Sequence, residues 1–97
     1  MFDAATIYQE ILDLEAAVDM TIQRHELGME IEDYQSSIRD MNNLGQQYYE
    51  MEEYENSVNA YKKGIDIAEK HDVHDLDYSL HQNLGTSYRN NKQYKLA

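Results

Sequence analysis

The sequence predicts an all-α fold in which antiparallel helix pairs stack as a short α-solenoid. Residues 43–48 (Asn-Leu-Gly-Gln-Gln-Tyr) are echoed by residues 83–88 (Asn-Leu-Gly-Thr-Ser-Tyr), and Tyr54 is echoed by Tyr94. A repeat with a period of forty residues is typical of solenoids, whose units bury their apolar faces only against neighbouring units. Helical spacing of apolar residues recurs along the chain, period-two alternation does not, and the chain contains no proline.

The first expected helix begins after Asp3, a candidate N-cap, with Phe2 packing on Ile7 one turn inside the helix. It should run to about Leu27 and end at Gly28, because glycine readily takes the left-handed conformation that closes helices. Its apolar residues have helical spacing: Tyr8, Ile11, Leu12, Val18 and Ile22.

Ile31 and Tyr34 lead into a second expected helix, and a short polar turn at residues 51–53 separates it from a third. The second helix carries Ile38, Met41, Leu44, Gly45, Tyr48 and Tyr49. The third carries Tyr54, Ser57, Val58, Tyr61, Ile65 and Ala68 on one face.

Residues 71–77 have no sustained period and several capping side chains, which predicts a loop ending in an N-cap. A fourth helix should carry Tyr78, His81, Leu84, Gly85 and Tyr88. Asn90 and Asn91 then indicate a turn, after which residues 93–97 begin a fifth helix.

The composition describes one small acidic domain of 97 residues, with 19 Asp and Glu against 8 Lys and Arg and a formal charge of −11. This charge argues against nucleic acid and against anionic membranes as partners, and it is compatible with a basic partner. The chain has no cysteine, no secretory signal and no apolar run long enough to span a membrane. We therefore expect a cytoplasmic protein.

Residues 41–68 resemble a tetratricopeptide repeat. Leu44-Gly45 and Tyr48 match its first helix, and the second helix is matched by Tyr54, Ser57 and Tyr61. A second copy of the pattern is carried by Leu84, Gly85, Tyr88, Tyr94 and Ala97. The resemblance divides the chain into an N-terminal helical segment, residues 1–37, and repeats in residues 38–97, one complete and one truncated. It implies close helix crossings at both glycines.

The resemblance is to a lengthened repeat, because the period of forty residues exceeds the usual value of about 34. Gly64 also replaces the usual alanine, and the usual closing proline is missing. Lengthened repeats are similar to those of bacterial peptide-sensing regulators of the Rap and PlcR type. They are also similar to those of kinesin-light-chain and mitotic-spindle scaffolds, and the two groups stay open alternatives.

The resemblance places Asn43 and Asn83, which precede the two Leu-Gly pairs, on the concave surface of the repeat. An asparagine there can exchange hydrogen bonds with a peptide backbone. Arg39 lies one turn before Asn43, a spacing that resembles half of the clamp with which chaperone-binding members hold a C-terminal carboxylate. The alternative is that these are solvated side chains and that Asp40 or Glu50 neutralises Arg39. The predicted peptide site consists of Arg39, Asn42, Asn43, Gln46, Tyr49, Gln82 and Asn83.

Other residue clusters favour structural roles. The nine tyrosines have core spacing, with Tyr48, Tyr61 and Tyr88 in packing positions, and His81 is interpreted as a packing residue. The loop residues His71, Asp72, His74, Asp75 and Asp77 are of types that bind metals, but their spacing matches no defined metal loop. We expect no metal, no cofactor and no enzymatic activity, because no catalytic motif is present.

These observations predict a protein–protein interaction module that binds a peptide or a helix in a concave groove. One alternative is the ligand-sensing fragment of a bacterial peptide-responsive regulator. The other is a self-assembly module, with a homodimer formed through the fourth and fifth helices, because the second repeat would leave apolar surface open.

Overall fold

The computed structural model describes the backbone of residues 4–96 and the side chains of residues 4–92. Within this range the chain forms four α-helices and no strand: α1 (Ala4–Glu30), α2 (Tyr34–Glu50), α3 (Tyr54–His71) and α4 (Asp77–Leu96). The all-α prediction is confirmed, as are the second and third helices and the loop that precedes α4. The predicted cap at Asp3 and Phe2 lies outside the described residues.

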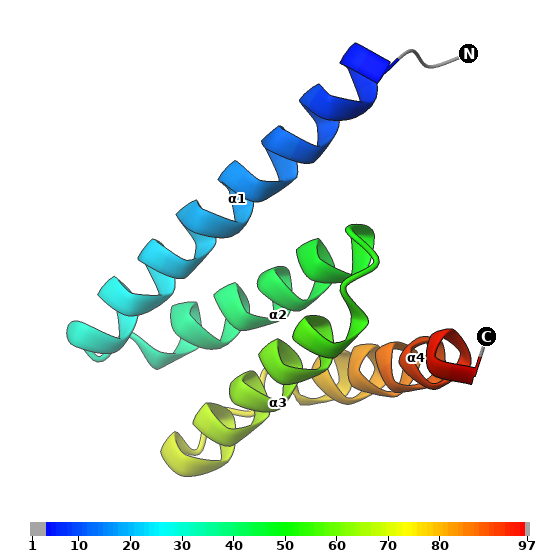
Figure 1. Ribbon diagram of the computed structural model, residues 1–97. Coiled ribbons are helices and arrows are strands. Elements are labelled where there is room, and N and C mark those ends of the chain that lie inside the picture. The colour runs from blue at the N-terminus through cyan, green and yellow to red at the C-terminus, as the bar shows by residue number, and fades with distance from the viewer. Residues whose placement is uncertain (1–3, 97) are drawn as a thin grey trace.

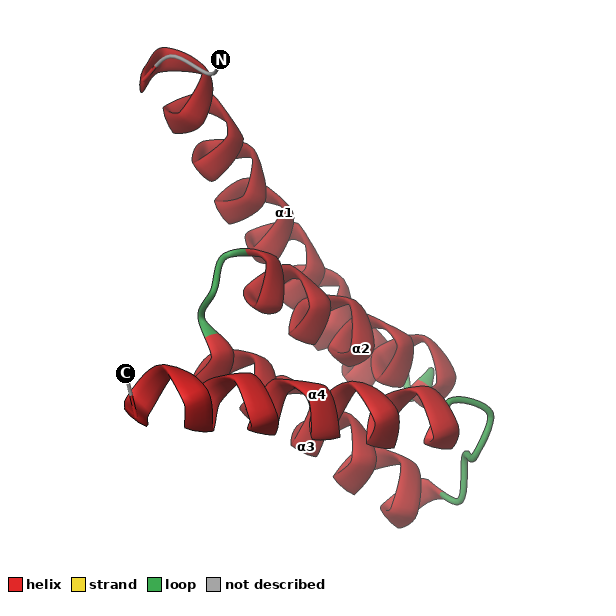
Figure 2. Cartoon of the chain, turned by 90° about the vertical axis from the view of Figure 1, so that its right-hand side faces the viewer, coloured by secondary structure: helices red, strands yellow, loops and turns green. Residues whose placement is uncertain are grey.

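Helix α2 is the centre of the arrangement, since it contacts each of the other three helices (Figure 1). Among the described residues, α1 contacts α2 and neither of the other helices, whereas α3 contacts both α2 and α4. Helix α4 passes across α3 and also touches α2 (Figure 2). At 1.5 Å per residue, the 27 residues of α1 extend to about 40 Å, and the 17 residues of α2 to about 25 Å. The N-terminal half of α1 therefore projects beyond α2, where its apolar residues are exposed.

The core forms where α2 meets its neighbours. Ile38 of α2 and Leu80 of α4 have the lowest exposed fractions among the large apolar residues, 1% and 0%. The buried apolar cluster consists of Val18, Ile38, Met41, Leu44, Ala60, Tyr61, Ile67, Ala68 and Leu80. Most of these residues belong to α2 and α3. Helical spacing predicted the α2 members and also Tyr61 and Ala68, but not Ala60, Ile67 or Leu80.

The same turn joins α1 to α2 and α2 to α3. Glu32 and Glu52 have positive φ angles of 62° and 60°. The next residues, Asp33 and Glu53, donate backbone hydrogen bonds to the carbonyl oxygens of Gly28 (2.7 Å) and Tyr48 (2.9 Å). This is the Schellman pattern, in which one left-handed residue closes the helix.

The predicted end of the first helix at Gly28 is therefore wrong. Helix α1 continues to Glu30, and Glu32, not the glycine, takes the left-handed conformation. Gly28 is instead required by packing, since a Cβ atom there would lie 2.5 Å from the Ser37 Oγ of α2. The position needs glycine because α1 and α2 approach closely there. The sequence signals of helix ends do not reveal such a close approach.

Replacing Glu52 by glycine should raise the free energy of unfolding by about 1 kcal/mol, because the left-handed conformation is strained for residues with a Cβ atom. Urea denaturation measures this difference. Glu52→Gln is the matched control, since it removes the charge and keeps the strained backbone. An equal gain in the glutamine variant would attribute the effect to charge repulsion and contradict the backbone explanation.

The predicted turn at Asn90 and Asn91, and with it the fifth helix, is also wrong. Helix α4 continues without a break to Leu96. Asparagine is only mildly unfavourable inside a helix. Here the Asn90 side chain also finds a tertiary partner, since its Nδ2 donates to the Tyr49 hydroxyl at 2.5 Å.

The two Leu-Gly pairs have different surroundings. A Cβ atom on Gly45 would lie 2.4 Å from the ring of Tyr61, so α2 and α3 cross closely there, as predicted. A Cβ atom on Gly85 would meet nothing within 4 Å, so the predicted close crossing at Gly85 is wrong. The predicted packing roles of His81 and Tyr88 are wrong for the same reason, since this face of α4 is uncovered and both residues are exposed.

Candidate functional site

A hollow of about 280 Å³ lies between α2 and α4, with Tyr61 of α3 also in its lining. Helix α2 contributes Gln46 and Tyr49, one turn apart on the same face. Helix α4 contributes Asn83, Thr86 and Ser87. Three of the seven predicted site residues, Gln46, Tyr49 and Asn83, therefore lie around one hollow.

Asn42 joins this group through a hydrogen bond. The Nδ2 of Asn83 donates to the Oδ1 of Asn42 at 3.1 Å, which links α4 to α2. The bond uses one amide proton of Asn83 and the carbonyl oxygen of Asn42. The Asn42 amide group and the Asn83 carbonyl oxygen then provide the donor and the acceptor that a peptide backbone requires.

Tyr49 forms a fixed wall of the hollow. Its hydroxyl accepts the hydrogen bond from Asn90, and its ring packs edge-on against Tyr54 with 5.3 Å between ring centroids. A side chain held at both ends loses little conformational entropy when a ligand packs on it. Tyr49 is thus suited to contact a ligand through its ring.

The floor of the hollow joins three helices through buried hydroxyl groups. Ser57 Oγ of α3 donates to the Gly45 carbonyl oxygen of α2 at 2.7 Å, and it lies 2.9 Å from Ser87 Oγ of α4. Tyr61 lies beside them with an exposed fraction of 3%, and burial raises the pKa of its hydroxyl. The floor is therefore uncharged at neutral pH.

The other predicted site residues do not line this hollow. Arg39 and Gln82 are exposed to solvent and Asn43 is half-buried. Asp40 is bonded to Arg24 of α1 at 3.4 Å, so Arg24 and not Arg39 is its partner in the structure. The clamp-like spacing of Arg39 and Asn43 consequently brings no positive charge to the hollow.

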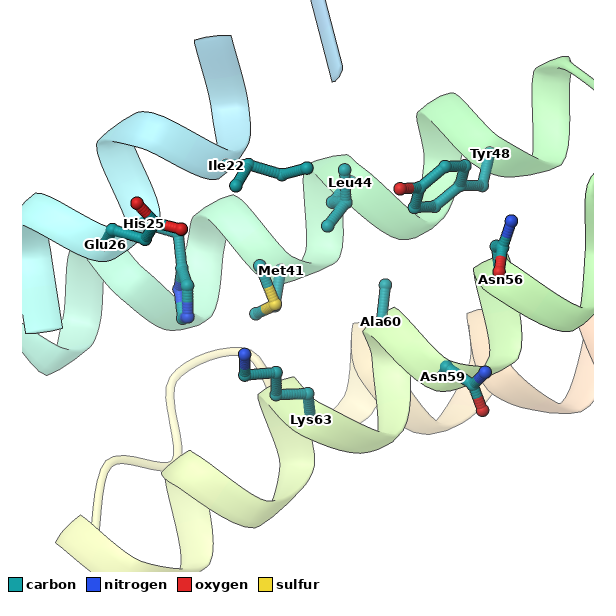
Figure 3. A pocket seen from close by; sticks show the side chains of 10 residues that line it. All are labelled: Ile22, His25, Glu26, Met41, Leu44, Tyr48, Asn56, Asn59, Ala60 and Lys63. Atoms are coloured by element: carbon teal, nitrogen blue, oxygen red, sulfur yellow. The ribbon is translucent and has the colours of Figure 1, made fainter. Parts of the chain in front are cut away.

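A second groove, which the sequence analysis missed, runs between α1 and α3 across α2 (Figure 3). It has a volume of about 300 Å³ and an apolar floor that includes Met41, Leu44 and Ala60. Glu26 and Lys63 lie at its edges on α1 and α3. Only the register of α1 on α2 creates this groove, and residues 1–37 carry no motif that predicts that register.

Side chains of types that bind metals lie in the loop between α3 and α4 and at the two helix ends beside it. Both ring nitrogens of His74 have carboxylate partners, Asp72 at 2.6 Å and Asp77 at 2.8 Å, and these hydrogen bonds raise the pKa of His74. The His71 ring stacks on Tyr34 at 3.5 Å. Within residues 4–92 no three His, Asp or Glu side chains form a group that could hold a metal ion. His74 thus connects the end of α3 to the start of α4, and His71 connects α3 to α2.

No helix within residues 4–96 combines the length and the hydropathy that crossing a membrane requires. Comparisons of the chain with protein-family models, with curated proteins and with solved structures give no match.

Proposed function

We propose that this chain is a protein–protein interaction module that binds an extended peptide in the hollow between α2 and α4. The observation that carries the proposal is the meeting of Gln46, Tyr49 and Asn83 around one hollow, with Asn42 bonded to Asn83. All four residues also belong to the peptide site that the sequence predicts.

The proposal includes the architecture, a short tetratricopeptide-like solenoid of antiparallel helix pairs. Its support is that contacts recur with a shift of forty residues. Arg24 of α1 is bonded to Asp40 of α2, and the residues forty positions later, Gly64 and Leu80, pack together with 3.1 Å between the position of a Cβ on Gly64 and Leu80 Cδ2. Repetition of this kind is expected of stacked units.

The size of the hollow and the charge of the chain limit the kinds of peptide that could bind. A hollow of about 280 Å³ is small for a whole ligand, so it suits one or two side chains of a segment whose backbone runs along α2 and α4. The formal charge of −11 favours peptides that carry Lys or Arg outside the hollow.

Peptides selected by the intact chain from a random displayed library test the placement. Asn83→Ala should raise the Kd of a selected peptide about tenfold, because hydrogen bonds to the peptide backbone are lost. The amide signals of Gln46, Tyr49 and Asn83 should shift when the peptide is added.

Asn59→Ala is the matched control, since Asn59 lines the groove between α1 and α3 and not the hollow. A peptide that loses affinity in Asn59→Ala and keeps it in Asn83→Ala would place binding in that other groove. Failure to select any peptide would count against the peptide-binding function as a whole.

A further inference from the structure

The exposed large apolar side chains of the described structure lie at the two ends of the helix series. Helix α4 carries two of them, Tyr78 and Tyr88, which are 79% and 44% exposed. The other seven lie on α1 or directly after it: Ile7, Tyr8, Ile11, Leu12, Met20, Leu27 and Ile31. Helices α2 and α3, which have neighbours on both sides, have none in this group.

The open face of α4 corresponds to a covered face of α2. Subtracting forty from Tyr78, His81, Gly85 and Tyr88 gives Ile38, Met41, Gly45 and Tyr48. In α2, helix α3 covers this face, with Tyr61 against Gly45. In α4 the same face is open around Gly85. The structure therefore shows what kind of element this face accepts: a helix placed as α3 is placed on α2.

The outer face of α1 corresponds in the same way to the face of α3 that packs on α2. The shift of forty residues that relates Arg24–Asp40 to Gly64–Leu80 also relates Met20 to Ala60 and Leu27 to Ile67. Ala60 and Ile67 are buried in the core, with exposed fractions of 5% and 7%. Met20 and Leu27, in contrast, are 62% and 56% exposed.

We infer that copies of this chain stack head to tail, with the Met20–Leu27 face of α1 in one copy covering the Gly85 face of α4 in the next. Each contact would repeat the packing of α3 on α2. The two faces differ, so the contact is heterologous, and each copy keeps one unused face for a further copy. Such assembly goes beyond peptide binding and does not use the hollow between α2 and α4.

Charge complementarity supports a second copy as the occupant. Helix α3 begins only four residues after α2 ends, so the same packing places residues near 13 of α1 beside residues near 92 of α4. The first region carries Glu10, Asp13 and Glu15, and the first Lys or Arg of the sequence is Arg24. The second carries Arg89 and Lys92, both exposed. Opposite charges at this end favour the head-to-tail orientation.

Two variants that each damage one face give a direct test by sedimentation. Met20→Glu places a charge on the α1 face, and Gly85→Leu fills the open α4 face. Both positions are exposed, so circular dichroism should remain that of the wild type. The average mass of the sedimenting wild-type species should increase when the protein concentration is raised about a hundredfold. Each variant alone should weaken association about tenfold or more.

The mixture of the two variants separates head-to-tail stacking from other contacts. Met20→Glu keeps an intact α4 face and Gly85→Leu keeps an intact α1 face, so their mixture should form a one-to-one dimer and nothing larger. Tyr8→Glu, at an exposed position on another side of α1, is the control and should associate like the wild type. If leucine disturbs α4, then Tyr78→Glu replaces it, because Tyr78 is on the same open face.

A wild-type chain that stays monomeric at every concentration would overturn the inference. So would association that both variants leave intact, or a mixture that forms no heterodimer while the wild type associates. Reversing the charges tests the orientation: Asp13→Lys and Lys92→Glu should each weaken self-association, and mixing the two variants should restore pairing between them.

Discussion

Gly45→Ala should lower the free energy of unfolding by about 1–3 kcal/mol, whereas Gly85→Ala should leave it unchanged or raise it by up to about 1 kcal/mol. Both glycines follow a leucine, lie inside helices and occupy the same position of the forty-residue repeat. The new methyl group on Gly45 would lie 2.4 Å from the buried ring of Tyr61, which cannot rotate away freely. On Gly85 it would meet open space, and alanine is the better helix former.

Urea denaturation of both variants measures the difference, and each serves as the control of the other. Tyr61→Ala tests the cause, because the Gly45→Ala and Tyr61→Ala double variant should lose less stability than the sum of the two single variants. Equal effects at Gly45 and Gly85 would show that the crossing of α2 and α3 is looser than the structure describes. Additive losses would mean that Tyr61 is not what limits the space at Gly45.

These two glycines also mark the limit of what the sequence could predict. The repeat correctly indicated helices around both Leu-Gly pairs, and the spacing of apolar residues predicted the core of α2 and part of the core of α3, without Ala60 and Ile67. A repeated motif does not reveal, however, whether a neighbour covers each copy. The structure covers the Gly45 face with α3 and leaves the Gly85 face open, and the predicted roles of His81 and Tyr88 failed with it.

The helix ends were predicted less well than the helices themselves, because tertiary contacts outweighed the local preferences on which the predictions rested. The helix-ending role assigned to Gly28 rested on local conformational preference, and so did the turn expected at Asn90. In the structure, tertiary contacts decide both positions, with Ser37 against Gly28 and Tyr49 bonded to Asn90. Local preferences of about 1 kcal/mol are readily outweighed by such contacts.

The candidate site was predicted in part. Asn42, Gln46, Tyr49 and Asn83 come together because residues on one face of α2 and one face of α4 meet when the two helices pack. Arg39 and Asn43 do not line the hollow, although Arg39 is only two turns before Gln46 on α2. The groove beside α1 required the register of a helix that carries no repeat motif, so it was not predictable.

A pair of buried hydroxyl groups below the hollow constrains the arrangement of three helices. Ser57 and Ser87 have exposed fractions of 0% and 1%. Since Ser57 donates to the Gly45 carbonyl oxygen, Ser87 must be the donor in the contact between the two hydroxyls. One serine on α3 therefore holds α2 on one side and α4 on the other.

Ser57→Ala should lower the free energy of unfolding by about 1–3 kcal/mol, because the hydroxyl of Ser87, which is 1% exposed, loses its acceptor. Alanine retains the Cβ atom, so lost hydrogen bonding and not altered packing dominates the effect. Thr86→Ala is the matched control: Thr86 Oγ1 donates only within α4, to the Gln82 carbonyl oxygen at 3.1 Å, and its loss should change stability little.

Adding Ser87→Ala to the Ser57 variant removes the hydroxyl that was left unpaired. The double variant should therefore be about as stable as Ser57→Ala alone, or more stable, since replacing both partners costs less than leaving one unsatisfied. Hydrogen exchange should show the amides of α4 losing protection in Ser57→Ala before those of α2, because α4 has no second buried polar contact of this kind to α3 among the described residues. If the two single substitutions instead lose stability additively, then the two hydroxyls act separately, and α4 is held by apolar packing around Leu80 and by the hydrogen bonds of Asn83 and Asn90 to α2.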